Sequence, residues 1–96
     1  MAKAEISWKR VTEDEQSIQV YAQHVGNEWR FFRRGKRYDV WQPIPEPPLA
    51  DWLELLDAVR RMIPRRRLKP RDEERVMRRI REHFPEADMG PAQFPP

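Results

Sequence analysis

Cationic and aromatic side chains are the residue types of this sequence that could do chemistry together. Lysine and arginine can neutralise phosphate groups, and exposed aromatic rings can stack on unpaired bases. Two stretches concentrate such residues, namely FFRRGKRYDVW from Phe31 to Trp41 and RRMIPRRRLKPR from Arg60 to Arg71. Their local charge suggests an anionic partner more strongly than the net charge of +3 does.

The first candidate site is the basic tip of a predicted hairpin. Its four cations surround a single glycine, and they are Arg33, Arg34, Lys36 and Arg37. A glycine at the first turn position is typical of a type II′ hairpin, which would place Arg34 opposite Arg37. Like charges across a turn repel each other, so the tip weakly suggests a visiting anion, although an exposed turn also tolerates that cost.

The second candidate site lies between two predicted helices, within the run from Arg60 to Arg71. That run holds seven cations and no acid, and its predicted phosphate contacts are Arg65, Arg66, Arg67 and Lys69. Cations on one connector sit together in space and could follow a nucleic-acid backbone. The competing interpretation is a solvated face with internal ion pairs, because Glu74, Arg78 and Glu82 have i,i+4 spacing on the next helix.

The third candidate site is a set of rings that the predicted register places on one face of a sheet. It comprises Tyr21, Phe32 and Trp41, with Arg30 beside them. The rings could stack bases, or they could pack on one another, on a protein partner or on a second copy of the chain. We favour packing or protein contact, with Tyr21 against Phe32 and Arg30 over Trp41 as a cation–π pair.

The sequence contains no recognisable catalytic, metal or cofactor motif. It has no cysteine, three glycines and two isolated histidines, and no HExxH, GxSxG or P-loop pattern occurs. We expect His24 to pack on Trp29 at the rim of the sheet, and His83 to complement the end of a helix. These features predict a non-enzymatic binding module that needs no cofactor.

The first half of the chain predicts the sheet that positions these residues. Alternating β-branched and aromatic residues indicate strands at 5–11, 17–25, 28–34 and 37–42. Turns at Gly26-Asn27 and Gly35-Lys36 set the register between neighbouring strands. In that register, the apolar residues gather on one face, which comprises Ile6, Trp8, Ile18, Val20, Ala22, Trp29, Phe31, Tyr38 and Val40.

The second half predicts two amphipathic helices, at 49–63 and 70–84, after a proline-rich linker at 43–48. Pro70 suits the first turn of the second helix, and the acids that follow it complement the helix dipole. The predicted fold is α+β: a four-stranded antiparallel β-meander has one face covered by two C-terminal α-helices (ββββαα).

The length of 96 residues predicts a single α+β domain over 1–85, followed by a flexible, proline-containing tail at 86–96. No apolar run resembles a secretory signal or a membrane span, so we expect a cytoplasmic protein without membrane contact. The leading hypothesis is association with DNA or RNA through the basic tip and the connector. The alternative is a protein-interaction or accessory protein, in which a partner or a second copy covers the aromatic face.

Overall fold

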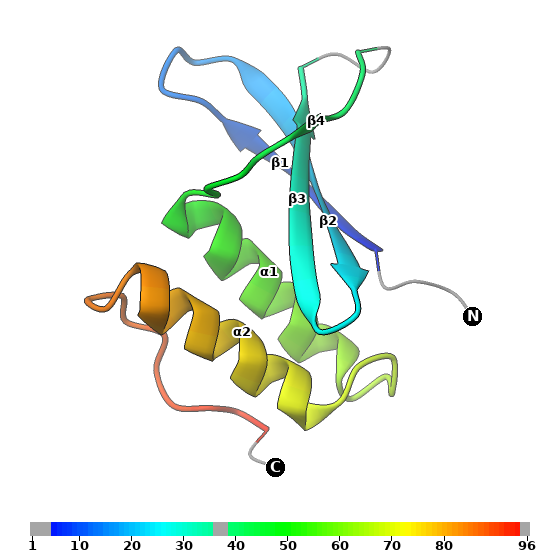
Figure 1. The fold of residues 1–96 in the computed structure, drawn as a ribbon, viewed down its shortest axis with the longest axis vertical. Helices are drawn as coiled ribbons and strands as arrows, with labels where there is room; N and C mark the ends of the chain where they lie inside the picture. The colour runs from blue at the N-terminus through cyan, green and yellow to red at the C-terminus, as the bar shows by residue number, and fades with distance from the viewer. Residues whose placement is uncertain (1–4, 36–38, 95–96) are drawn as a thin grey trace. The chain divides into compact units, whose positions relative to one another are not determined.

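The computed structural model describes residues 5–35 and 39–94 (Figure 1). The elements in chain order are β1 (Glu5–Val11), β2 (Ser17–Val25), β3 (Glu28–Arg34), β4 (Gln42–Pro43), α1 (Leu49–Met62) and α2 (Pro70–His83). A four-stranded antiparallel sheet is therefore followed by two helices, which confirms the predicted ββββαα fold.

The chain divides into two compact units, Met1–Pro47 with the sheet and Pro48–Pro96 with the helices. Strand order in the first unit is β1-β2-β3-β4, so each strand pairs with its neighbour in sequence. Two points stay predictions: the helices cover the apolar face of the sheet, and residues 1–85 form one domain.

Strands β1, β2 and β3 pair in the register that the sequence predicts. Trp8 pairs with Val20, and Ala22 pairs with both Ile6 and Phe31. Directly paired residues share a face, so the alternation of each strand sorts apolar from polar residues. The buried residues of this face are Ile6, Ile18, Val20, Ala22 and Phe31. Trp8 adds an edge-on ring contact with Phe31, with centroids 6.2 Å apart.

Strand β4 differs from its prediction, of which Arg37 and Tyr38 lie outside the described residues. We expected it over 37–42, but it comprises only Gln42–Pro43, and Gln42 rather than Tyr38 pairs with Arg33. The predicted turn at Gly35 is wrong, because a type II′ turn needs a positive φ and Gly35 does not have one.

The new register moves the partner of β3 by four residues, from Tyr38 to Gln42. Val40 lies before the first of the β3–β4 pairs and its side chain is 82% exposed, so the prediction that it packs on the apolar face is wrong. After β4, the amide of Ile44 donates to the carbonyl of Phe31 at 2.8 Å. Pro43 has no N–H to donate, which suits a short strand at the edge of a sheet.

The helical unit is an antiparallel pair (Figure 1). Both helices end within one residue of their predicted bounds. Pro70 is the first residue of α2, and the Asp72 carboxylate accepts a hydrogen bond from the Lys69 amide at 2.8 Å. The buried apolar side chains of the two helices are Trp52, Leu55, Leu56, Ala58, Val59, Val76, Met77 and Ile80.

The β1–β2 loop contains a strained residue that gives a test of the fold. Glu15 has a φ of 62°, in the left-handed region that most L-residues avoid. Asparagine accepts this conformation more readily, so we expect Glu15→Asn to stabilise the protein by about 0.5 kcal/mol and raise Tm by ~2–4 °C. Thermal unfolding followed by circular dichroism would measure the change.

Asp14→Asn is the matched control, because it removes one acid from the same loop at a residue without a positive φ. An equal rise in Tm for both variants would attribute the gain to charge and contradict the assignment of strain to Glu15.

Candidate functional site

The strongest candidate site is the connector between α1 and α2 together with the first turn of α2. We call it the cationic connector, and its members are Arg65, Arg66, Arg67, Lys69 and Arg71. All five side chains are exposed. None of these side chains pairs with a carboxylate in the described part of the chain. Such a group of uncompensated cations suits a polyanion.

The main chain of the connector is held by a Schellman motif at the end of α1. The Arg67 amide donates to the Met62 carbonyl at 3.1 Å, and the Arg66 amide donates to the Ile63 carbonyl at 2.9 Å. Arg66 takes the left-handed position of this motif, with a φ of 60°. Leu68 is 7% exposed and anchors the connector between its cations. Local hydrogen bonds and one apolar anchor therefore direct the arginines outward.

Most arginines of the helices, by contrast, lie beside acids. Their ion pairs are Arg60–Glu73, Arg61–Asp57, Arg75–Asp72, Arg78–Glu74 and Arg79–Glu82. The predicted pair of Glu74 with Arg78 is confirmed at 2.9 Å, whereas Glu82 lies 3.6 Å from Arg79 rather than beside Arg78. A solvated face with internal ion pairs thus describes α2 well, but it does not describe the connector.

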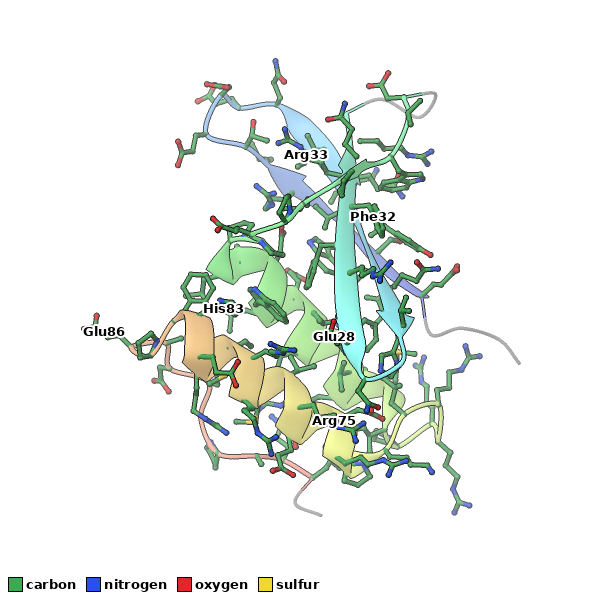
Figure 2. The ribbon with its side chains drawn as sticks, viewed as in Figure 1. Glu28, Phe32, Arg33, Arg75, His83 and Glu86 are labelled. Carbon is green, nitrogen blue, oxygen red and sulfur yellow. The ribbon has the colours of Figure 1, made fainter. Side chains whose placement is uncertain are left out.

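The basic hairpin tip is only partly assembled. Arg33 and its neighbour Phe32 project from opposite sides of β3 (Figure 2), as alternation requires. Arg34 is engaged: its Nε donates to Gln19 Oε1 at 3.1 Å, and its guanidinium lies 4.3 Å from the centroid of the Trp41 ring. The other two predicted contacts, Lys36 and Arg37, lie outside the described residues. Of the two tip cations that the structure describes, Arg33 is therefore the exposed one.

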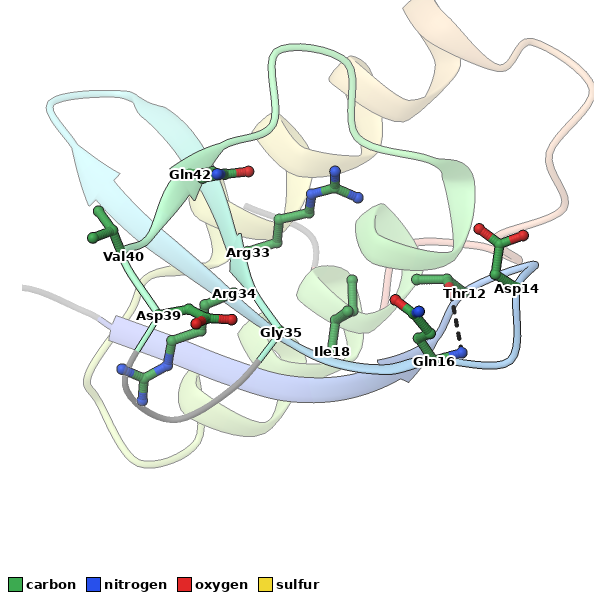
Figure 3. A pocket seen from close by; sticks show the side chains of 10 residues that line it. All are labelled: Thr12, Asp14, Gln16, Ile18, Arg33, Arg34, Gly35, Asp39, Val40 and Gln42. Atoms are coloured by element: carbon green, nitrogen blue, oxygen red, sulfur yellow. Dashed lines mark hydrogen bonds between the residues drawn. The ribbon is translucent and has the colours of Figure 1, made fainter.

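A pocket lies beside the tip, between the β1–β2 loop and the segment from Arg33 to Gln42 (Figure 3). Its lining residues are Thr12, Asp14, Gln16, Ile18, Arg33, Arg34, Gly35, Asp39, Val40 and Gln42. The cations Arg33 and Arg34 are balanced by Asp14 and Asp39, so the lining residues that the structure describes offer no excess charge to a phosphate. The pocket is a weaker anion site than the cationic connector.

The structure brings the three predicted rings together as an aromatic cluster. Tyr21 lies 5.9 Å from Phe32 and 5.5 Å from Trp41, measured between ring centroids, and both pairs are tilted by 41°. The predicted contact of Tyr21 with Phe32 is confirmed. All three side chains are half-buried. Because each ring already covers part of another, the cluster resembles a packed patch more than an open platform for bases.

The predicted cation–π pair of Arg30 with Trp41 is wrong, because Arg34 lies over that ring instead. The shift of the β3 partner by four residues explains the exchange, because Arg33 pairs with Gln42 and the neighbouring residues Arg34 and Trp41 then lie side by side. An even shift keeps the same side chains on the same face. Trp41 therefore still joins Tyr21 and Phe32, while Arg30 is exposed.

The chemistry of Tyr21 offers a test of the cluster. Burial, a hydrogen bond with Glu5 and the negative charge of Glu5 all raise the pKa of the Tyr21 phenol above its ordinary value. We expect Glu5→Gln to lower that pKa, because it removes the charge that opposes phenolate formation. Absorbance of the phenolate during an alkaline titration would show this, in a Tyr38→Phe background that leaves Tyr21 as the remaining tyrosine.

Glu28→Gln is a suitable control, because it removes an exposed acid from another strand. An unchanged titration after Glu5→Gln would contradict the assigned contact.

Both histidines stack on tryptophans. His24 lies on Trp29 with centroids 4.4 Å apart and an angle of 9°, which confirms the predicted packing. His83, at the end of α2 (Figure 2), stacks on Trp52 with centroids 6.0 Å apart. The second contact was not predicted, but it follows from the antiparallel pairing, which sets the start of α1 beside the end of α2. These contacts account for the placement of both rings.

Sequence reasoning missed a buried ion pair within the helical unit. Glu73 has no exposed surface, and its Oε2 accepts from Arg60 Nε at 2.6 Å. Two tail amides complete its shell: Gln93 N donates to Oε2 at 2.9 Å, and Phe94 N donates to Oε1 at 2.8 Å. The tail, which we expected to be flexible, has no helix or strand from Phe84 to Phe94 but is hydrogen-bonded there.

A signal for this pair was present in the sequence. Glu73 falls at i−3, i−4 and i−7 from Val76, Met77 and Ile80, so it lies on the apolar stripe of its helix. We assigned it instead to helix-start electrostatics, together with Asp72 and Glu74. A charge on an apolar stripe indicates a buried partner, and Arg60 supplies one.

Ionisation of Glu73 should couple to tail docking. Burial alone would raise the pKa of Glu73, but the bond from Arg60, the two tail amides and the Arg60 charge outweigh burial and lower it. The ionised form thus stabilises the fold at neutral pH. This contribution weakens as pH falls below the ordinary glutamate pKa of 4.5 and is lost below the lowered pKa of Glu73. Amide chemical shifts of Gln93 and Phe94 would follow the loss.

In the same titration, Glu73→Gln should remove the acid transition of the two tail amides, and Glu74→Gln should preserve it. Tail amides that titrate alike in both variants would contradict the coupling.

Comparisons with known proteins add no relative to this description: no protein-family model, curated protein or solved structure matches the chain. Over residues 5–35 and 39–94, no group of three or more His, Cys, Asp or Glu side chains is placed to hold a metal ion. Neither of the two described helices combines the length and the apolar character that crossing a membrane requires.

Proposed function

We propose that this chain is a non-enzymatic nucleic-acid-binding protein that contacts phosphates through the cationic connector. The observation that carries the proposal is the contrast within the helical unit. Five exposed cations of the connector have no acidic partner among the described residues, whereas the arginines at 60, 61, 75, 78 and 79 lie beside acids. Arginine forms bidentate hydrogen bonds with phosphate, and its planar group is only weakly hydrated.

The conformation of Arg66 also supports the proposal. Glycine is the usual residue at the left-handed position of a Schellman motif, and a longer side chain there is strained. An arginine at this position does not stabilise the turn. A contact made by its guanidinium would explain why the position carries a cation.

Phosphate contacts position a protein on nucleic acid but read no sequence. The connector alone should therefore bind DNA and RNA with little preference, and its affinity should fall steeply with salt. Arg33 and the predicted tip residues Lys36 and Arg37 are secondary candidates for further phosphate contacts. Arg34 is not, because Trp41 and Gln19 already occupy its guanidinium.

The decisive experiment is a salt titration of binding to random duplex and single-stranded DNA and RNA. The test variant replaces Arg65, Arg66, Arg67 and Arg71 with Gln, which removes four unpaired charges. With a slope of about −0.9 per phosphate contact on a duplex, we expect the log–log salt dependence to become shallower by about 3 to 4 units.

The matched control replaces Arg61, Arg75, Arg78 and Arg79 with Gln, which removes the same charge from residues that have acidic partners. It should keep most of the wild-type slope. Equal losses in both variants would assign binding to bulk charge rather than to the connector. No binding of the wild type at low salt would overturn the proposal, and a dimer disrupted by Trp41→Ala would then favour the protein-interaction alternative.

A further inference from the structure

The Arg60–Glu73 pair directs most of its hydrogen-bonding capacity to the C-terminal tail. Beyond the bond between the two side chains, Glu73 accepts from the amides of Gln93 and Phe94. Arg60 Nη2 donates to the carbonyls of Met89 and Pro91, at 3.4 Å and 3.3 Å. The pair therefore holds a segment of six residues, 89–94, by both of its charged groups.

Every one of these four tail contacts is to the main chain. Two amides point at the carboxylate and two carbonyls point at the guanidinium, while no tail side chain takes part in these bonds. Recognition of this kind depends on an irregular main chain that leaves its amides and carbonyls unpaired. The sequence of the segment matters in one respect: proline has no N–H, so it could not donate at the positions of Gln93 and Phe94.

The two helices hold the site in place. Arg60 lies in the last turn of α1, and Glu73 lies in the first turn of α2, at either end of the connector. The Arg60 side chain is 15% exposed, and its Nη2 also lies 3.8 Å from Met77 Sδ. A buried ion pair is costly unless its remaining hydrogen-bonding capacity is used. The tail amides and carbonyls supply those bonds.

We propose that the Arg60–Glu73 pair is a peptide-docking site that binds an irregular main-chain segment, and that the chain's own residues 89–94 occupy it. The ligand class is a peptide that presents two consecutive amides to the carboxylate and two upstream carbonyls to the guanidinium. A tether raises the effective concentration of the tail to the millimolar range, so the tail excludes a free peptide from the site. Release of the tail should make the site available to the same segment added in trans.

The experiment uses the full chain and a free peptide of residues Glu86–Pro96. In the wild type, amide exchange at Gln93 and Phe94 should be slowed on the order of tenfold or more relative to the free peptide. In an undocked variant, Gln93→Pro with Phe94→Pro, every helix residue is unchanged but both amide donors are lost. Peptide at about 0.1 mM, well below the effective concentration of the tethered tail, should then shift the NMR signals of Arg60 and Glu73 in the undocked variant and leave those of the wild type unchanged.

Two controls separate docking from non-specific binding. A peptide with proline at the same two positions should not bind the undocked variant. Adding Glu73→Gln to the undocked variant should abolish peptide binding, whereas adding Glu74→Gln, the exposed neighbour, should preserve it. The dispersion of the helix signals reports folding of each variant in the same spectra.

Fast exchange at Gln93 and Phe94 in the wild type would overturn the proposal. So would an undocked variant that stays folded and shows no response to the peptide, or one whose response survives Glu73→Gln. The inference is independent of nucleic-acid binding, because neither readout involves a nucleic acid.

Discussion

An arginine side chain keeps its positive charge at every accessible pH, so each guanidinium must lie in water, beside a carboxylate or a neutral oxygen acceptor, over an aromatic ring or beside a bound anion. This constraint sorts the cations of the chain. Arg60 ends at the buried Glu73, and Arg34 ends over Trp41 with Gln19 beside it. Arg61, Arg75, Arg78 and Arg79, which lie on the helices, are placed beside acids about one turn away. The cationic connector ends in water, which makes it the place where a bound anion would change the surroundings of the charges most.

The buried pair also determines how the connector is presented. Arg60 and Glu73 join the end of α1 to the start of α2, so the ends of the intervening segment are held together. Between them, the Schellman motif and the buried Leu68 fix the main chain. The proposed binding of phosphates would then order only the outer parts of the arginine side chains. A smaller loss of conformational entropy would therefore oppose that binding. A flexible loop of the same composition would bind the same phosphates more weakly.

The parts of the fold that were predictable depend on local patterns. Alternation and the Gly26-Asn27 turn sufficed for the register of β1, β2 and β3, and apolar periodicity with Pro70 sufficed for the helices. The fourth strand was not predictable in this way, because a Gly-x pair permits a type II′ turn without requiring one. Glu73 shows a different limit. Asp72, Glu73 and Glu74 are equivalent as helix-start charges, but successive residues project about 100° apart, so they reach the Lys69 amide, the buried pair and Arg78 respectively.

The arrangement of the aromatic cluster bears on which surface recognises a partner. A platform for bases needs a ring face that is open to solvent, and the tilted contacts of Tyr21 with Phe32 and Trp41 cover parts of these faces from one side. Arg34 covers the Trp41 ring as well, so its charge is directed to the cluster rather than to a ligand. Stacking on bases would require these ring contacts to separate first, and the free energy of separating them would lower the affinity. Contacts at the connector need no such rearrangement, because its cations are already exposed, and for this reason charge rather than stacking should dominate recognition.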